Sequence, residues 1–482
     1  MTRVDLASIS PAIPLGPLDG RYRAAAAPLV NHLSEAALNR ARLEVEVEWL
    51  IHLTATGALP GAPELSEEEV AYLREIVATF GESEIGEMAA IEAETRHDVK
   101  AVEYFLKRRL AAAPDRLGSA TVLPQVAEIV HIFCTSEDIN NLSYALTIAA
   151  AVREEWLPAA LEMVEAIKEL AVENAAVPML ARTHGQPATP VTLGKELAVT
   201  VHRLRRQLRR IEATEYLGKI NGATGTYAAH IVASPGVDWP AIAQDFVEHL
   251  GLSFNPVTTQ IESHDWQAEL FADISRFNRI CHNLATDMWT YISMEYFTQI
   301  PVEGATGSST MPHKVNPIRF ENAEANLELS NALLDSLGST LTTSRLQRDL
   351  TDSTTQRNIG VAFGHSLLAL NNLVKGLGRL ECNTDELAAD LDRNWEVLAE
   401  AIQSVMRAAF LRGIDGMDNP YEKLKELTRG HRVDGPALRE FVGGLGLPDE
   451  DAARLAELSP ASYVGLAADI AREETAAWRG SR

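Results

Sequence analysis

The sequence is poor in cysteine. Cys134, Cys281 and Cys382 are the only three among 482 residues, they lie far apart, and no two have the spacing of metal ligands. An odd number of distant cysteines argues against a disulfide framework and is typical of proteins from a reducing compartment. We therefore expect a cytoplasmic protein.

Features that direct a chain to a membrane are also lacking. There is no uninterrupted run of eighteen apolar residues, so we expect no transmembrane helix. The first residues, MTRVDLASISPAIPLGPLDGRY, lack the basic and then apolar layout of a signal peptide and are broken by prolines.

Positive charge is scarce relative to negative charge. Lys and Arg total 43 and Asp and Glu total 67, so the formal net charge is −24. Such a surface repels the phosphates of nucleic acids and anionic lipids, so neither is an expected partner. An anionic ligand would need a local cationic pocket set against this field.

Recognisable metal and nucleophile motifs are missing as well. The chain has no His-Glu-x-x-His, no Cys-x-x-Cys, no Gly-x-Ser-x-Gly and no Gly-x-x-x-x-Gly-Lys-Ser/Thr. We expect no metal and no cofactor, and chemistry that comes from Ser, His, Lys and Arg side chains.

Helical periodicity is plentiful. Long stretches run from Leu142 to Glu173, with a kink expected at Pro158, and follow Pro317 and Gly360. Two more stretches place apolar residues three or four apart. Their members are Leu193, Leu197, Val201, Leu204, Leu208 and Ile211, and then Leu270, Ile274, Phe277, Cys281, Leu284 and Met288.

Several helix starts are readable. Ser66 with Glu69 is a capping box, Asn383 is a similar signature, and Thr189 is an expected N-cap with a proline directly after it. Residues 43–50, LEVEVEWL, alternate like a strand and also form one helical face. We favour a helix there because the neighbours are helical and no partner strand is evident.

These patterns predict an all-α fold with a central long-helix bundle flanked by two smaller helical domains. We expect an N-terminal helical domain over 1–124, the bundle over 125–378 and a C-terminal helical domain over 379–482. Apolar stripes this long, here called seams, often continue into another subunit, so we expect an oligomer. The alternative is that every seam is covered within one chain.

Polar islands stand where the helices stop, and helix ends of this kind attract anions. The islands are DGRY (19–22), ETRHDVKAVEY (94–104), CTSEDINN (134–141), RTHGQPATP (182–190), TTQIESHD (258–265), GSSTMPHKVNP (307–317) and SRLQRDLTDSTTQRN (344–358). Each also has an ordinary structural interpretation: helix caps at Thr135 and Ser136, solvated groups at His97 and His184, and a solvated helix face at Arg345, Arg348 and Arg357.

Together the islands resemble a known family. GSSTMPHKVNP resembles the signature of the fumarase/aspartase superfamily. RTHGQPATP, CTSEDINN, HDVKAVEY, TTQIESHD, SRLQRDLTDST and PYEKLKELTRG together resemble the bacterial adenylosuccinate lyases. The likeness runs from near residue 20 to near residue 465. It implies an L-aspartase/fumarase-like fold, a homotetramer with active sites shared between subunits, and nucleotide substrates.

The resemblance also implies a reaction and its residues. The family releases fumarate from adenylosuccinate, giving AMP, and from the succinylcarboxamide ribonucleotide SAICAR, giving AICAR, in purine biosynthesis. Ser308 matches the base that removes the Cβ proton, and His184 matches the acid that protonates the leaving nitrogen, with His313 as a rival. The matched substrate-binding positions are Arg21, Tyr22, Arg96, His97, Asp98, Thr135, Ser136, Gln260, Ser309, Lys314, Val315, Asn316, Asn322, Arg348, Ser353 and Arg357.

Two positions depart from the family pattern. Ala305 stands where many members have Glu, and Arg96 stands where close bacterial relatives have Asn. The alternatives to this activity are another fumarate-releasing lyase of the superfamily, such as an argininosuccinate lyase or a fumarase, and a helical scaffold that has lost catalysis.

Overall fold

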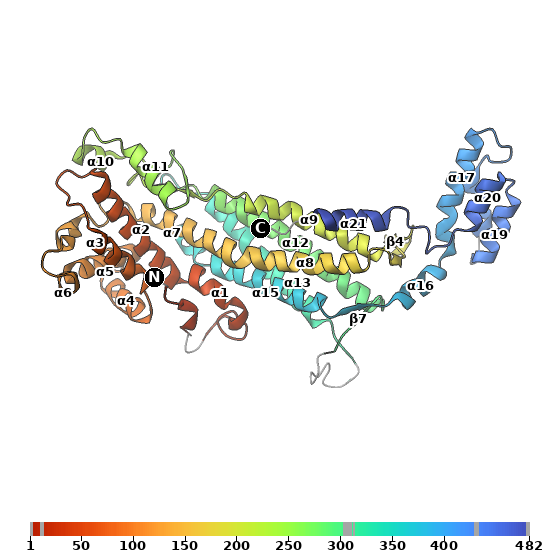
Figure 1. Ribbon diagram of the computed structural model, residues 1–482, viewed down its shortest axis with the longest axis horizontal. Helices are drawn as coiled ribbons and strands as arrows, with labels where there is room; N and C mark the ends of the chain where they lie inside the picture. Colours follow the sequence, from red (N-terminus) through yellow and green to blue (C-terminus); the bar gives the residue numbers. More distant parts are fainter. Residues whose placement is uncertain (1–2, 10–13, 302–310, 312–313, 429–432, 479–482) are drawn as a thin grey trace. The chain divides into compact units, whose positions relative to one another are not determined.

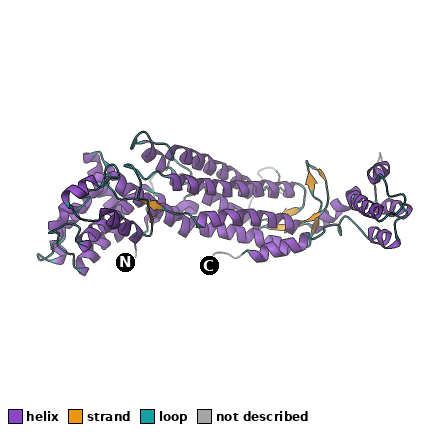
Figure 2. Cartoon of the chain, turned by 90° about the horizontal axis from the view of Figure 1, so that it is seen from above, coloured by secondary structure: helices purple, strands orange, loops and turns teal. Residues whose placement is uncertain are grey.

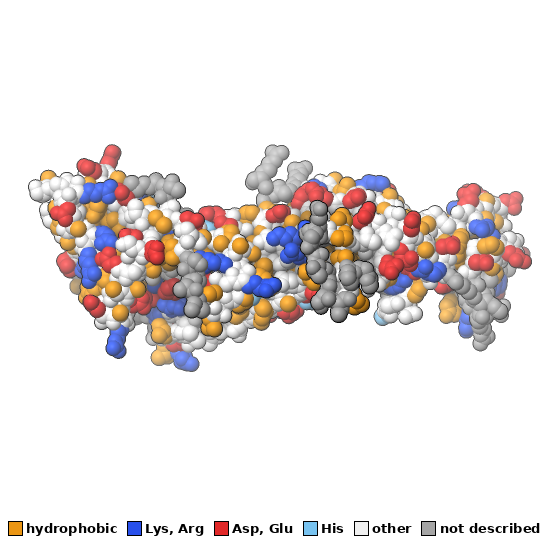
Figure 3. Space-filling model, turned by 90° about the horizontal axis from the view of Figure 1, so that it is seen from below, with side chains coloured by type: hydrophobic (Ala, Val, Ile, Leu, Met, Phe, Trp, Pro, Cys, Tyr) orange, Lys and Arg blue, Asp and Glu red, His pale blue; other side chains and the backbone are white. Residues whose placement is uncertain are grey.

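The structure is a computed structural model that describes residues 3–9, 14–301, 311, 314–428 and 433–478. In these ranges nearly all regular structure is helical, and strands occur only as pairs of two or three residues (Figure 2). The predicted all-α class is confirmed. None of the described helices combines the length and the apolarity needed to cross a membrane. Acidic and basic side chains are interspersed over the face shown in Figure 3.

The chain divides into two compact units, each assembled from three stretches. Unit 1 comprises Met1–Ala160, Gln207–Arg279 and Ala325–Asn371; unit 2 comprises Leu161–Arg206, Ile280–Glu324 and Asn372–Arg482. The expected domain borders at 124 and 378 stay a prediction. By these ranges, five long helices contribute residues to both units. They are labelled in Figure 1: α8 (Leu157–Glu173), α9 (Leu193–Glu212), α12 (Asp265–Ser293), α13 (Ile318–Leu341) and α15 (Ile359–Leu377).

The remaining helices of unit 1 are shorter, and the apolar faces of α2, α3, α5 and η2 share one core. Ser66 accepts the amide of Glu69 at 3.3 Å, and the Glu69 carboxylate accepts the amide of Ser66 at 2.9 Å, so the capping box is confirmed. Residues 43–50 lie within α2, which confirms the helix there. The elements are η1 (Leu6–Ser8), α1 (Arg23–Leu33), α2 (Glu35–Thr56), α3 (Glu67–Ala78), α4 (Glu82–Thr95), α5 (Asp98–Ala112), α6 (Pro114–Leu117), η2 (Leu123–Ile129), α7 (Ser136–Ala150), η3 (Ala151–Trp156), β5 (Leu217–Gly218), α10 (Ala228–Ala233), α11 (Trp239–His249), β6 (Ser253–Phe254) and α14 (Thr351–Gln356).

The bundle segments of unit 1 are joined by polar as well as apolar contacts. The indole of Trp156 packs edge-on against Phe277, with ring centroids 5.1 Å apart, and its N–H donates to Ser366 at 2.8 Å. Ser366 in turn donates to Asn278 at 2.9 Å. Every residue named above on the α9 and α12 seams is buried, which confirms both seams.

A π turn, η3, joins α7 to α8. The backbone N–H of Leu157 donates to the carbonyl of Val152, five residues back, and Pro158 follows without a donor of its own. A π turn is a known response to a site where the regular helical ladder is interrupted. The kink expected at Pro158 stays a prediction; directly before this proline the structure has a widened turn.

In unit 2 the expected cap at Thr189 is wrong. Helix α9 begins at Leu193, and the hydroxyl of Thr192 accepts the amide of Lys195 at 3.3 Å. The residues after Pro190 are extended because β4 (Val191–Thr192) pairs antiparallel with β1 (Pro178–Met179). A pairing with a distant segment, which local propensity does not encode, delays the helix.

Helix α9 approaches the end of α8 closely in unit 2. A Cβ added at Gly194 would lie 2.4 Å from the carbonyl oxygen of Ala171 and 2.5 Å from the Cα of Ala175. Both atoms are backbone, so neither can rotate away, and glycine alone fits this contact.

The rest of unit 2 consists of short hairpins and a C-terminal group of helices with its own core. Asn383 accepts the amide of Glu386 at 3.3 Å, which confirms the predicted cap of α16. The elements are β2 (Arg182–Thr183), β3 (Gln186–Pro187), β7 (Phe297–Gln299), β8 (Leu380–Cys382), α16 (Thr384–Asp392), η4 (Trp395–Leu398), α17 (Ala399–Leu411), α18 (Pro420–Thr428), α19 (Gly435–Gly444), α20 (Asp449–Ala456) and α21 (Ala467–Ala477).

Candidate active site

Asp98, the first residue of α5, gathers two arginines in unit 1. Its Oδ2 lies 2.8 Å from a guanidinium nitrogen of Arg42 and 3.0 Å from one of Arg357. His97 is the N-cap of the helix, and its ring accepts the amide of Lys100 at 3.3 Å. Burial raises the pKa of the Asp98 carboxyl, but Arg42, the amide of Val99 and Arg357 outweigh it and lower that pKa below its usual value.

Arg357, the C-cap residue directly after α14, reaches Asp98. It donates 2.8 Å hydrogen bonds to both the carbonyl and the hydroxyl oxygen of Ser353, and it lies 3.3 Å from Glu35. The structure therefore brings together Asp98, Ser353 and Arg357, three predicted substrate-binding residues from two separate islands.

The start of α7 forms a second group in unit 1. A guanidinium nitrogen of Arg348 lies 2.9 Å from the carboxylate of Glu137, whose side chain is 3% exposed. Arg348 is itself only 18% exposed, so the solvated-face interpretation does not hold for it. Thr135 and Ser136 directly precede this carboxylate, and the amide of Thr135 donates to Asp138 at 2.8 Å.

Asp138 makes several of the contacts that hold this group together. It pairs with Lys219 at 2.8 Å, and both side chains are fully buried. The backbone amides of Asn221 and Gly222 donate to the same carboxylate at 2.9 and 3.1 Å. One buried ion pair thus binds the loop after β5 to the start of α7.

That loop also holds Gln260. The side-chain amide of Gln260 donates to the carbonyl of Ala223 at 3.0 Å, and Asn221 donates to the hydroxyl of Thr258 at 2.8 Å. Gly225, at φ 74°, is required here because an added Cβ would lie 2.4 Å from the carbonyl oxygen of Thr258. Gln260 is therefore attached, through this loop, to the predicted binding residues at Thr135 and Ser136.

Arg21 and Tyr22 stand at the end of the loop that precedes α1. The Arg21 guanidinium lies 5.9 Å from the centre of the Tyr22 ring. Leu18 of the same loop packs on α15, where an added Cβ at Gly364 would lie 2.7 Å from it. Arg96 ends α4 in the left-handed conformation, at φ 55°, and is exposed.

His184 lies in unit 2, at the tip of the β2–β3 hairpin. It is exposed, and with Gly185 it occupies a two-residue turn in which both residues have positive φ, 55° and 73°. Two positive values are the geometry of a type I′ hairpin turn. Arg182 anchors the base of the hairpin with 2.6 Å bonds to the hydroxyl of Tyr296 and the carboxylate of Asp390.

The remaining described positions of the signature region also belong to unit 2. Lys314 and Val315 are exposed, and the carbonyl of Val315 accepts the side-chain amide of Gln299 at 2.9 Å. Asn316 is half-buried, and Asn322 on α13 accepts the amide of Asn372 at 2.9 Å. Ser308, Ser309, Ala305 and His313 lie outside the described residues.

Sequence reasoning missed several charged groups of these clusters, namely Arg42, Glu137, Asp138, Lys219 and His264. His264 is 1% exposed, at φ 61°, and its Nε2 lies 3.3 Å from the carboxylate of Asp352, next to Ser353. A charged residue inside an apolar helical stripe, as Arg42 is, was the available signal. Over the described ranges, no group of three or more His, Cys, Asp or Glu side chains has the arrangement of a metal site.

Comparisons with known proteins place the chain in a family. The family model described as Lyase matches residues 20–329, and the model of the adenylosuccinate lyase C-terminal region matches residues 344–464. The chain is 50% identical to the adenylosuccinate lyase of Escherichia coli strain K12, covering 95% of this chain and 98% of that one. It is 48% identical to that of Haemophilus influenzae, with 95% and 97% covered.

Solved structures show the same fold at low identity. A fumarate lyase from Mesorhizobium sp. BNC1 has a TM-score of 0.74 at 18% identity, covering 94% of this chain and 98% of that chain. The 3-carboxy-cis,cis-muconate lactonizing enzyme of Pseudomonas putida has a TM-score of 0.70 at 20% identity, covering 93% and 96%. The fold, together with the match to the Lyase model, defines an enzyme of the fumarase/aspartase superfamily.

The C-terminal match and the near-full-length identity narrow this class. The chain belongs to the adenylosuccinate lyase family.

Proposed function

We propose that the protein cleaves adenylosuccinate to AMP and fumarate, and SAICAR to AICAR and fumarate, as a step of purine biosynthesis in the cytoplasm. The observation that carries this proposal is the identity of 50% across 95% of the chain with a curated adenylosuccinate lyase. The clustering of Asp98, Ser353 and Arg357 in unit 1 supports it independently, because these residues come from distant parts of the sequence.

The reaction is a β-elimination. Ser308 takes the proton from Cβ of the succinyl group, the C–N bond breaks with its electron pair leaving on nitrogen, a C=C bond forms, and His184 protonates the nitrogen. Among the side chains, the imidazole of histidine is the usual donor of such a proton near neutral pH. The exposed hairpin tip leaves the ring of His184 accessible to a ligand.

Loss of the Cβ proton places a second negative charge on the adjacent carboxylate. Donors fixed where that charge develops lower the barrier, and removing one typically slows a reaction by about 10²–10³. Lys314 and Asn316 follow Ser308 by six and eight residues, which is close enough for one loop to present all three to the same carboxylate.

The substrate carries a phosphate and two carboxylates. Guanidinium groups bind such oxygens in a two-pronged manner, which suits Arg21, Arg348 and Arg357 to this role. Arg357 and Arg348 are already held by Asp98 and Glu137, so little side-chain entropy remains to be lost when an anion binds.

We also assign a homotetrameric assembly with shared active sites. Its support is the exposure of large apolar side chains on the long helices, at Val199, Trp289, Ile318 and Leu329. Light scattering should give about four times the chain mass of 52.6 kDa; a mass near one chain would contradict the assignment.

The activity is tested by measuring fumarate release from adenylosuccinate, from argininosuccinate and from malate in separate reactions. We expect AMP and fumarate from the first and no turnover of the other two. Turnover of argininosuccinate or malate alone would establish a different lyase of the superfamily, and no turnover of any would establish a scaffold.

Variants test the assigned roles. Ser308→Ala and His184→Gln should each lower kcat by at least about 10². The control is His202→Gln, a histidine of α9 that is 58% exposed and paired with Glu474 at 2.9 Å; it should stay within twofold of the unaltered protein. A Ser308→Ala protein with unchanged kcat would remove Ser308 from its role.

A further inference from the structure

Arg42 is buried, and its guanidinium group makes polar contacts. It lies on α2, is 1% exposed, and directs hydrogen bonds to three different side chains. Nε donates to Asn140 at 2.9 Å, one terminal nitrogen donates to Asn39 at 2.8 Å, and the other donates to Asp98 at 2.8 Å. All three branches of the planar group are therefore engaged.

Two of these three hydrogen bonds lead, through the residue that accepts them, to arginines that the proposed function uses. On one side Asp98 shares a single oxygen, Oδ2, between Arg42 and Arg357. On the other side the amide of Asn140 donates to Glu137 at 2.7 Å, and the same Glu137 oxygen, Oε1, lies 2.9 Å from Arg348.

The result is a continuous chain in which the charges alternate. It runs from Arg357 through Asp98 to the central Arg42, and from there through Asn140 and Glu137 to Arg348. Asp98 lies between Arg42 and Arg357, and Glu137 lies between Arg348 and the side-chain amide of Asn140. Neither carboxylate can therefore turn toward a substrate anion and repel it. With Glu35, which lies 3.3 Å from Arg357, the group holds three guanidinium groups and three carboxylates, so its charges balance within a chain of net charge −24.

From this geometry we infer that Arg42 is a positioning residue: it fixes Asp98 and Glu137 and thereby sets the spacing and direction of Arg357 and Arg348 for the anionic groups of the substrate. The inference rests on the proposed function. Lysine can replace arginine here only in part, because an ammonium group is a point charge, whereas the rigid guanidinium reaches Asn140 and Asp98 in one plane. Methionine keeps most of the volume and removes every hydrogen bond.

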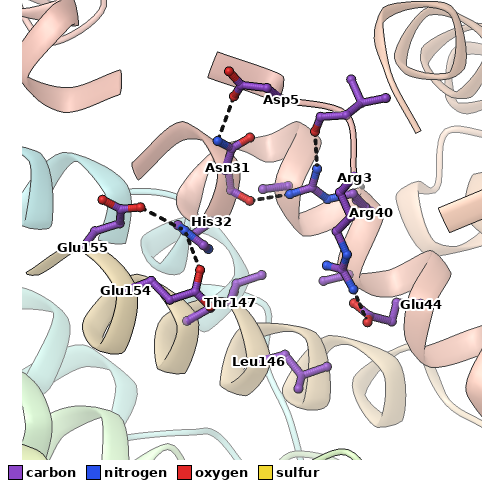
Figure 4. A pocket seen from close by; sticks show the side chains of 14 residues that line it. Arg3, Asp5, Asn31, His32, Arg40, Glu44, Leu146, Thr147, Glu154 and Glu155 are labelled. Atoms are coloured by element: carbon purple, nitrogen blue, oxygen red, sulfur yellow. Dashed lines mark hydrogen bonds and ion pairs between the residues drawn. The ribbon is translucent and has the colours of Figure 1, made fainter. Parts of the chain in front are cut away.

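The test compares Arg42→Met and Arg42→Lys with a matched control on the same helix. Arg40 lies two residues earlier on α2 and is 5% exposed, and Figure 4 shows it beside Asn31. Its guanidinium donates to the backbone carbonyls of Val4 and Asn31, and not to the Asp98 or Glu137 carboxylate. Arg40→Met therefore measures the general effect of removing a buried arginine from α2.

Steady-state kinetics with adenylosuccinate separates positioning from folding. We expect Arg42→Met to raise KM at least about tenfold with kcat within about threefold, because binding common to substrate and transition state is lost. Arg42→Lys should recover part of the affinity through Asp98, and Arg40→Met should keep KM within twofold. The inhibition constant of AMP, used as a product inhibitor, should rise by the same factor as the KM for adenylosuccinate.

Asn140→Ala keeps Arg42 and cuts only the relay to Glu137, so it provides the answer if Arg42→Met does not fold. It should raise KM about threefold or more, with kcat near that of the unaltered protein. Normal KM in Asn140→Ala or in a folded Arg42 variant would overturn the inference, as would an equal rise in Arg40→Met. If the unaltered protein releases no fumarate at all, the proposed function falls and this inference falls with it.

Discussion

Replacing Lys219 with methionine tests how strongly the buried pair with Asp138 holds the candidate site together. The two side chains are fully buried and 2.8 Å apart. With an effective dielectric constant of about 20, the attraction at that distance is about 6 kcal/mol. Desolvation of both ions offsets much of it, so the pair adds little net stability, but removal of one partner leaves a buried charge uncompensated.

The structure then decides where in the usual range the loss falls. Breaking a buried pair typically costs about 3–5 kcal/mol. Asp138 retains the amides of Thr135, Asn221 and Gly222 at 2.8, 2.9 and 3.1 Å, which partly solvate its charge. We therefore expect Lys219→Met to lower the free energy of unfolding by about 3 kcal/mol, the low end of that range.

Lys168→Met is the matched control. Lys168 lies 2.6 Å from Glu165, closer than Lys219 is to Asp138, but these side chains are 27% and 41% exposed. An exposed pair of this kind contributes about 0–1 kcal/mol, so the same substitution should shift the unfolding midpoint only slightly. The two variants together show whether burial or distance sets the effect.

The assay is urea unfolding followed by far-UV circular dichroism at one fixed protein concentration, because association would make the apparent stability depend on concentration. Hydrogen exchange should also accelerate at the amides of Asn221 and Gly222 in Lys219→Met. A loss below about 1 kcal/mol, or one equal to that of Lys168→Met, would refute the reasoning about the buried charge.

Three further substitutions are informative. Burial lowers the pKa of His131, but its 2.5 Å hydrogen bond with Glu46 and the charge of that carboxylate outweigh burial and raise the pKa above ~6.5. His131→Gln should therefore lower the free energy of unfolding most at pH 6, and this loss should disappear as the pH rises through the raised pKa. Urea titrations at several pH values measure it. Arg182→Lys should lower kcat about tenfold or more with less change in KM, because the hairpin that carries His184 loses its two-pronged anchor. Gly194→Ala should lower the free energy of unfolding by more than about 3 kcal/mol or leave the protein insoluble, because its Cβ meets backbone at 2.4 Å.

Each has a control in the same chain. Gly86→Ala, with nothing within 4 Å of the added Cβ, should be neutral or stabilising. His249→Gln, at a ring 56% exposed and 3.7 Å from Glu48, should change the free energy of unfolding by less than about 1 kcal/mol. Arg279→Lys, at a side chain 55% exposed, should leave kcat unchanged. A variant that behaves like its control contradicts the corresponding prediction.

Periodicity and capping chemistry were sufficient to predict much of the fold. The seams from Leu193 to Ile211 and from Leu270 to Met288 are buried as expected, since a 3.6-residue period depends only on local sequence. Ser66 and Asn383 cap their helices for the same reason. The cap near Thr189 failed because a strand pairing with residues 178–179 is not visible in the local pattern.

The sequence predicted which residue types form the candidate site, but not the buried residues that hold them in place. The islands identified Asp98, Arg348 and Arg357, because polar residues at helix ends stand out from an apolar background. Arg42 and Lys219 were missed because their partners lie 56 and 81 residues away in sequence, at Asp98 and Asp138, and a charge in an apolar stretch does not reveal which residue it pairs with. Pairing over such separations is set by tertiary structure alone.

The widened turn η3 has a consequence for how this chain tolerates insertions and deletions. A π turn holds one residue more than the α-helical turn it replaces, so every side chain of α8 is offset by about 100° from where an uninterrupted α7 would have placed it. The apolar stripe of α8, including Met163, Val164 and Ile167, is buried in that shifted phase. Loss of one residue between 151 and 156 would restore an ordinary helix and leave the stripe in its present phase, because the lost residue cancels the offset, whereas loss of one residue within α8 would turn the residues on one side of the gap by about 100°.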